Sequence, residues 1–283
     1  MVEFSVVIEG GGTKTAYSGG VLKCLLDNGI YANYGVGISA GAEFLLAYAS
    51  GQSKRLEVTG IDSISSKDAV GIRPFLKERN MFGLESTNAL IERLAPLDKE
   101  ALLNSPTRME EGVYNLKTHE IEYYDQTYID DDNTLTKASC ALLLLCRPYK
   151  FLDSLYMDAG LRVMIPIERS IELGYKKHLV ISCKEVGYVR KPAPGYQIWL
   201  ANRVYHDPII TQDLKDRHLR YNEQWELIEK MEKEGSALVL RPSKDMGISR
   251  YTTDRNKLEP WFNLGYQETL DRLDEIKAFL EME

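Results

Sequence analysis

The segment GISAG, residues 37–41, has the pattern Gly-x-Ser-x-Gly, in which the serine acts as a nucleophile. This pattern requires a tight turn from a strand into a helix, and its glycines let neighbouring backbone pass without clashes. The flanking residues agree, since YGVGI before Ser39 is typical of a strand and AGAEFLLAY after it is typical of a helix. A helix N-terminus favours developing negative charge. Ser39 is therefore a candidate nucleophile, with a plain tight turn as the alternative.

Three consecutive glycines, Gly10, Gly11 and Gly12, follow the first apolar run of the chain. Without side chains, they can turn several backbone N–H groups towards one point, which stabilises the oxyanion formed during ester hydrolysis. Because the carboxyl ends of parallel strands lie at one edge of a sheet, we expect this loop to face Ser39. The rival interpretation is a nucleotide site. However, Thr15 stands where the dinucleotide pattern needs glycine, and no Gly-Lys-Ser/Thr sequence follows.

A serine nucleophile needs a base. Only four histidines are available, namely His119, His178, His206 and His218. The order Ser39, Asp158, His206 matches that of α/β-hydrolases, but the histidines lie in a predicted turn, before a strand or in charged stretches. Asp158 itself follows an apolar stretch, and partial burial raises the pKa of a carboxyl towards that of a useful base. Taken alone, Asp158 is also explained as a turn residue.

The elements around these candidates alternate between strand and helix. Short apolar runs typical of buried strands and longer runs with helical spacing follow one another at residues 4–10, 15–29, 34–39 and 40–51. Gly19 and Gly20 are poor helix formers, so their place in a predicted helix indicates close packing. This order of elements predicts an α/β fold with a mainly parallel sheet and crossover helices.

The rest of the chain, residues 52–283, continues this alternation. We expect a hairpin over 110–125, strands at 177–183 and 236–243, and helices over 86–95, 135–146, 212–234 and 257–283 and from about Pro166. Ser86 or Thr87 is a candidate cap for its helix. The composition changes after Pro194. We therefore expect an α/β core over residues 1–194 and a mainly helical extension over 195–283 that packs on it and adds an edge strand.

Composition excludes several classes of protein. The 283 residues carry a net charge of −7, which argues against nucleic-acid binding because that function needs a basic face. The four cysteines form no Cys-x-x-Cys pair, so we expect no metal site and interpret them as reduced core thiols of a cytoplasmic protein. The N-terminus lacks the pattern of a signal peptide, and the longest apolar run, residues 138–146, is too short to cross a bilayer.

Taken together, these motifs resemble the patatin-like phospholipase family, in particular a bacterial subgroup of it. EGGGTKT, residues 9–15, resembles the family's oxyanion loop, with Lys14 as its basic residue, and GISAG resembles its nucleophile turn. DAG, residues 158–160, resembles its Asp-Gly-Gly/Ala motif, and PIERSIELGY resembles the continuation after that motif. The resemblance covers roughly residues 4–185.

The resemblance implies a three-layer α/β/α fold and a catalytic dyad without histidine. By it, Ser39 is the nucleophile, Asp158 is the base, and the oxyanion hole is formed by Gly10, Gly11 and Gly12. Positions that support these motifs are Lys14, Gly37, Gly41 and Gly160. The implied activity is lipid degradation, the hydrolysis of acyl esters such as phospholipids and lysophospholipids, without a metal or cofactor. Contact with a membrane surface as a peripheral protein would accompany such substrates.

Two positions depart from the family's pattern. Thr15 replaces the last glycine of the oxyanion loop and is a candidate cap of the next helix, while Ala159 replaces a common glycine and requires a negative φ. The alternative to an esterase is therefore an inactive relative that binds lipid or acts as a scaffold. We interpret the basic segments 175–178 and 188–192 as solvated surface rather than as contacts for anionic head groups. The acyl chain, head group and oligomeric state do not follow from the sequence.

Overall fold

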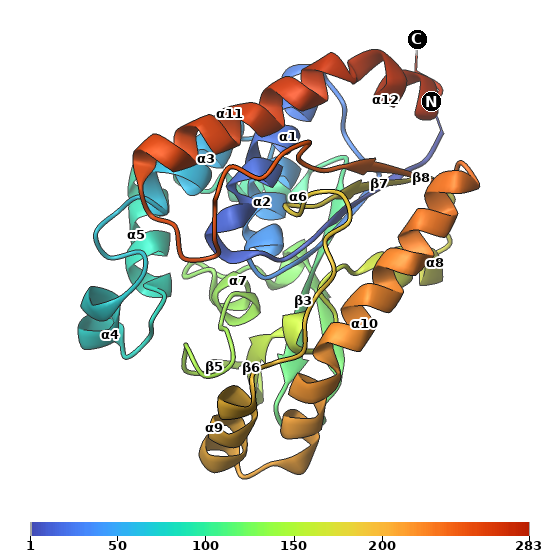
Figure 1. Cartoon of the computed structure of the whole chain (residues 1–283). Helices are drawn as coiled ribbons and strands as arrows, with labels where there is room; N and C mark the ends of the chain where they lie inside the picture. The colour runs from blue at the N-terminus through green and yellow to red at the C-terminus, as the bar shows by residue number, and fades with distance from the viewer. Residues whose placement is uncertain (1, 283) are drawn as a thin grey trace.

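A computed structural model describes residues 2–282, and an eight-stranded sheet forms its centre (Figure 1). The strands run in the order β5-β6-β3-β2-β1-β7-β8, and β4 pairs with β3. Their bounds are β1 Ser5–Ile8, β2 Tyr34–Ile38, β3 Arg108–Asn115, β4 Ile121–Asp125, β5 Tyr149–Phe151, β6 Ser154–Asp158, β7 His178–Ile181 and β8 Ala237–Leu240. The pairs within β3-β2-β1-β7-β8 are parallel, and those of β4, β5 and β6 are antiparallel. The mainly parallel sheet is thus confirmed.

The register of the parallel strands aligns their carboxyl ends. Ser5 of β1 lies opposite Tyr34 of β2 and His178 of β7, and Ile8 lies opposite Gly37. The loop after β1 and the turn after β2 therefore leave the sheet at the same edge. All four residues of β1 are buried, which explains why its sequence is a continuous apolar run instead of an alternating one.

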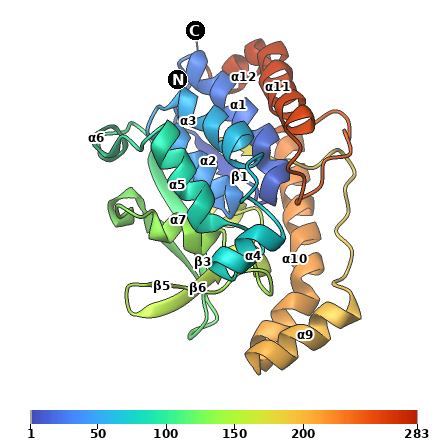
Figure 2. The ribbon, with the colours of Figure 1, turned by 90° about the vertical axis from the view of Figure 1, so that its left-hand side faces the viewer.

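Helices cover both faces of the sheet and make three layers (Figure 1, Figure 2). Val6 and Ile8 point into a core with Phe44 and Trp261, while Val7 points into a second core with Trp225. The first face carries α1 Ala16–Asp27, α2 Ala40–Ala49, α3 Ser53–Glu57, α5 Leu84–Leu94, α7 Thr134–Ser139 and α11 Arg255–Asp271. The second carries α8 Ile167–Glu172 and α10 Pro208–Lys233. The predicted α/β/α arrangement is confirmed.

Shorter elements complete the chain. These are α4 Ile72–Glu78, α6 Lys99–Leu103, α9 Gly195–Tyr205, α12 Leu273–Phe279, a π-helical segment at Val58–Ser63 and 3₁₀ turns at Gly12–Thr15, Gln126–Tyr128 and Ala159–Leu161. Both views place α9 at one end of the molecule and α11 with α12 at the other (Figure 1, Figure 2). Within residues 2–282, every helix is too short or too polar to cross a membrane.

Two close contacts attach the C-terminal helices to the first layer. α11 packs along α1, and a Cβ on Gly20 would lie 1.9 Å from the carbonyl oxygen of Phe262. On the other helix, a Cβ on Gly265 would lie 2.1 Å from the carbonyl oxygen of Tyr17. Only glycine permits this approach, which explains the glycine that the sequence places inside a helix. β8 pairs with β7, so the last third of the chain also extends the sheet.

Three local predictions were wrong. The helix expected over 135–146 ends at Ser139, because Asp158 N–H of β6 donates to Ala141 O and Leu144 takes a φ of 67°. α5 begins at Leu84 with Gly83 before it, so neither Ser86 nor Thr87 caps it, and the hydroxyl of Thr87 donates back to Gly83 O at 2.8 Å. Cys140 was expected in the core but is only half-buried, although all four cysteines are free thiols as expected.

Candidate active site

Ser39 lies between the end of β2 and the start of α2 in a conformation that side chains rarely adopt. Its φ is 57° and its ψ is −136°, a strained backbone that surrounding contacts must hold. Ser139 supplies one such contact, because its Oγ accepts from Ser39 N at 3.0 Å and donates to Gly112 O at 2.8 Å. The turn thus presents the Ser39 hydroxyl at the edge of the sheet, as a nucleophile turn requires.

The two glycines of the GISAG motif are fixed by steric contacts. A Cβ on Gly37 would lie 2.7 Å from the backbone nitrogen of Ala42. A Cβ on Gly41 would lie 2.7 Å from the carbonyl oxygen of Ile8 in the neighbouring strand. Any larger residue would push α2 away from the sheet, so these two glycines set the position of Ser39.

The glycine loop passes directly against Ser39. A Cβ on Gly10 would lie 2.9 Å from Ser39 Cβ, and Gly12 has a φ of 60°. The N–H of Gly10 donates to Met164 O at 3.1 Å, whereas the backbone hydrogen bonds found within residues 2–282 include none from the N–H of Gly11 or Gly12. The loop therefore has two backbone donors free beside the serine.

The C-terminal region holds this loop from the other side. Thr13 N donates to Arg250 O at 3.3 Å, and the indole nitrogen of Trp261 donates to Lys14 O at 2.7 Å. The ammonium group of Lys14 pairs with Glu185 at 3.1 Å. Thr15 does not cap α1 with its side chain, contrary to one of our expectations.

Asp158 ends β6 and reaches the same place from a distant part of the sequence. It is 4% exposed, and its Oδ1 accepts from Gly160 N at 2.7 Å. Burial raises the pKa of Asp158, while the Ser39 hydroxyl and the Arg217 guanidinium oppose that rise. The Ser39 hydroxyl is therefore close enough to affect the pKa of Asp158, although the hydrogen bonds found within residues 2–282 include none between these two side chains.

Ala159 follows Asp158 without backbone strain. It opens a 3₁₀ turn, and its φ is not among the positive values of the described residues. Ala159 therefore has the negative φ that we expected an alanine to need at this position. Gly160 is more constrained, since a Cβ there would lie 2.8 Å from Asp158 Oδ1.

One small cavity brings the predicted groups together. It has roughly 360 Å³ of empty volume and is lined by Gly10, Gly11, Gly12, Ser39, Leu142, Asp158, Gly160, Met164, Lys184, Arg190, Arg217 and Arg250. Every residue predicted as nucleophile, base or oxyanion donor lies in this lining. The supporting residues Lys14, Gly37 and Gly41 lie outside it.

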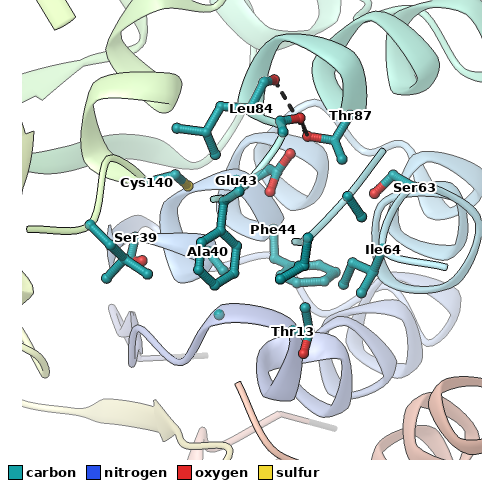
Figure 3. A pocket seen from close by; sticks show the side chains of 16 residues that line it. Thr13, Ser39, Ala40, Glu43, Phe44, Ser63, Ile64, Leu84, Thr87 and Cys140 are labelled. Atoms are coloured by element: carbon teal, nitrogen blue, oxygen red, sulfur yellow. Dashed lines mark hydrogen bonds between the residues drawn. The ribbon is translucent and has the colours of Figure 1, made fainter. Parts of the chain in front are cut away.

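A second cavity, mostly apolar, meets the first at Ser39 (Figure 3). It has about 540 Å³ of empty volume, and Phe44, Phe82 and Leu84 are among its apolar lining residues. Figure 3 shows Ser39 on one side of it, with Glu43 projecting into its interior. Burial raises the pKa of Glu43 to about 7. Ser39 therefore lies where an apolar cavity joins a polar one.

The basic side chains of the small cavity were missed by sequence reasoning. Arg190 was interpreted as part of a solvated segment, but it is only 8% exposed and lines the cavity. Lys184, Arg217 and Arg250 come from three further positions, and no local motif marks them. Ser139 was also missed, because its role depends on how α7 packs against the serine turn.

The histidines take no part in this arrangement. His119 Nε2 lies 2.7 Å from Asp207, and His178 is buried against Ser5 and Ser170. His206 is exposed, and His218 Nδ1 contacts Lys215 O in its own helix. None of the four lines either cavity at Ser39. Within the described residues, the carboxylates that line the two cavities at Ser39 are Asp158 and Glu43.

Comparison with known proteins gives matches to two families. The sequence model of the patatin-like phospholipase family matches residues 6–171, and that of a domain of unknown function, DUF6363, matches residues 207–281. Among solved structures, the chain is similar to the crystal structure of VipD from Legionella pneumophila, with a TM-score of 0.48 and 11% sequence identity, over 96% of this chain and 67% of that one. A search of curated proteins found no match.

Proposed function

Because the chain belongs to the patatin-like phospholipase family, we propose that it is a serine esterase that hydrolyses acyl esters of lipids. The observation that carries the proposal is the meeting of Ser39, Asp158 and the glycine loop in one cavity. Groups of these three types are the parts that acyl transfer needs: a nucleophile, a base and donors for an oxyanion.

The reaction proceeds in two steps. Ser39 Oγ attacks the ester carbonyl while Asp158 takes the hydroxyl proton, and the tetrahedral oxyanion is held by the free N–H groups of Gly11 and Gly12. Breakdown of the tetrahedral intermediate then breaks the bond to the leaving alcohol, and this alcohol receives the proton from Asp158. Water, deprotonated by Asp158, then attacks the acyl-enzyme, releases the fatty acid and restores Ser39. Gly10 lets the backbone of the loop approach Ser39 closely. It supplies no hydrogen bond to the oxyanion, because its N–H already donates to Met164 O.

The two cavities at Ser39 suggest how the substrate lies. The apolar cavity suits an acyl chain, because transfer of methylene groups from water to apolar surface is favourable. The alcohol part of the ester then lies in the small polar cavity beside Asp158.

The test of this function is labelling with a fluorophosphonate probe together with hydrolysis of p-nitrophenyl esters. We expect labelling and turnover in the wild type and loss of both in Ser39→Ala. Ser65→Ala is the control, because Ser65 lies outside both cavities. A folded wild-type protein that is neither labelled nor active would support the alternative, a lipid-binding or scaffold protein with the same fold.

Helix α9 supports contact with a lipid surface. Tyr196, Trp199 and Val204 are 67%, 66% and 55% exposed, and Tyr196 also lines a cavity that reaches Asp158. Exposed aromatic and aliphatic side chains at a cavity mouth are typical of peripheral binding to membranes. We expect Trp199→Ser to weaken co-sedimentation with lipid vesicles; unchanged binding would contradict this role. The free thiols support a reducing, cytoplasmic location.

A further inference from the structure

Four basic side chains surround one side of the small cavity. They come from separate segments: Lys184 and Arg190 from the connection between β7 and α9, Arg217 from α10, and Arg250 from the connection between β8 and α11. Asp158 is the single carboxylate in the same lining. The cavity beside the nucleophile therefore carries an excess of positive charge that acyl transfer itself does not need.

Within the described residues, none of these four cations forms an ion pair with a carboxylate. The ion pairs found within residues 2–282 include neither Lys184 nor Arg190, Arg217 or Arg250. Arg217 donates through Nε to Gly160 O, and the Arg190 guanidinium lies 5.3 Å from the ring centre of Tyr221. These contacts orient the arginines without neutralising them.

Two further carboxylates lie nearby. Glu185 pairs with Lys14, and Glu9, which accepts from the hydroxyls of Ser182 and Tyr221, balances part of the charge of Lys184 and Arg190. Burial and the neighbouring arginines lower the pKa of both Arg190 and Arg217. Clustering cations that are buried or partly buried is costly unless an anion compensates, so the arrangement fits a site whose counter-ion is a ligand.

We propose that Lys184, Arg190, Arg217 and Arg250 form a binding subsite for a phosphate monoester, carried on the alcohol side of the acyl ester. Guanidinium groups match the oxygens of phosphate with paired N–H donors, and three converging arginines suit its two negative charges. The same positive field disfavours head groups that carry an ammonium. Because the cavity also contains Ser39 and Asp158, the phosphate lies only a few bonds from the ester.

The subsite itself is independent of hydrolysis, whereas its place on the substrate rests on the proposed function. Its phosphate has two sources, a lipid head group or free phosphate in solution. The first arm of the test is calorimetric titration of the wild type with inorganic phosphate. We expect saturable binding that weakens at least tenfold in Arg190→Gln and in Arg250→Gln. Arg250 is only half-buried, so its variant tests the site even if Arg190→Gln fails to fold.

The second arm compares two substrates with one acyl chain, 1-acylglycerol 3-phosphate and the uncharged monoacylglycerol. We expect the ratio of kcat/KM for the phosphate ester to that for the neutral ester to fall at least tenfold in either arginine variant. Arg93→Gln is the matched control, because Arg93 is exposed on α5 and lies outside the lining, so both arms should be unchanged.

The outcomes separate the subsite from the esterase. Absence of phosphate binding by the folded wild type, or binding by both arginine variants that is as tight as that of the wild type, overturns the subsite. Phosphate binding with an unchanged substrate ratio supports the subsite, identifies free phosphate as its ligand and overturns its place on the substrate. Phosphate binding by a protein that hydrolyses neither ester supports the subsite and overturns the proposed function.

Discussion

Replacement of Asp158 by asparagine tests the dyad with little change in shape. Asparagine retains an oxygen that can accept from Gly160 N, so the turn after β6 should persist. What is lost is the base, and general-base catalysis contributes about 10²–10⁴-fold to a rate. Asp158 is the single carboxylate in the lining of the polar cavity, whereas Glu43 lines the apolar one. We therefore expect the upper part of this range, a loss of about 10³–10⁴-fold or roughly 4–5.5 kcal/mol in activation free energy.

The stability of the Asp158→Asn protein should not fall with its activity. Burial raises the pKa of Asp158 in the folded protein, so its ionised form weakens the native state as pH rises through that pKa. Asparagine removes this penalty, and we expect the melting temperature of the variant at pH 8 to equal or exceed that of the wild type. In the wild type, the rate should rise with pH as Asp158 ionises.

Two measurements are made on each variant: the rate of p-nitrophenyl butyrate hydrolysis and the melting temperature. Four single His→Ala variants are the controls, and we expect each to retain activity because none of the histidines lines the cavities at Ser39. Near-normal kcat in a folded Asp158→Asn protein would refute the dyad. Loss of activity in a histidine variant with unchanged stability would redirect the search for the base.

Two further variants test the supports of the site, and a third tests Glu111, a buried carboxyl of β3. Gly10→Ala brings a Cβ within 2.9 Å of Ser39 Cβ, so kcat should fall at least tenfold, whereas Gly195→Ala, with open space around it, should retain activity. Ser139→Ala leaves the N–H of the serine turn unpaired, which should lower the free energy of unfolding by about 1–3 kcal/mol, measured in urea, and lower kcat. Burial raises the pKa of Glu111 to about 8, so ionisation weakens the fold between about pH 4.5 and pH 8. Glu111→Gln should therefore stabilise the protein at pH 9 by about 3–5 kcal/mol more than at pH 4, by urea unfolding; equal effects at both pH values would contradict the shift.

The parts of the site that depend on backbone geometry could be predicted from sequence. A strained serine turn and a loop in van der Waals contact with it both require glycine, and glycine at fixed spacing is visible in a linear sequence. The parallel strands could also be predicted from the sequence, because strands buried on both faces are continuous apolar runs.

The cationic lining could not be predicted in the same way. Arg217 lies on one face of a long charged helix, and Arg250 lies in a connection, so nothing in either neighbourhood distinguishes them from solvated residues. The apolar run Leu142–Leu145 was misread for a related reason. These leucines line a cavity beside Asp158 in place of continuing a helix, and hydrophobicity alone does not separate the two cases.

Two contacts of the glycine loop come from residues that are synthesised late, near the C-terminal end of the described residues. A ribosome releases residues 10–14 long before it adds Arg250 and Trp261, whose backbone oxygen and indole nitrogen fix that loop. A nascent chain therefore has its serine turn before its glycine loop has either of these contacts. We expect a truncated chain that ends before residue 250 to hold this loop less rigidly than the described residues do.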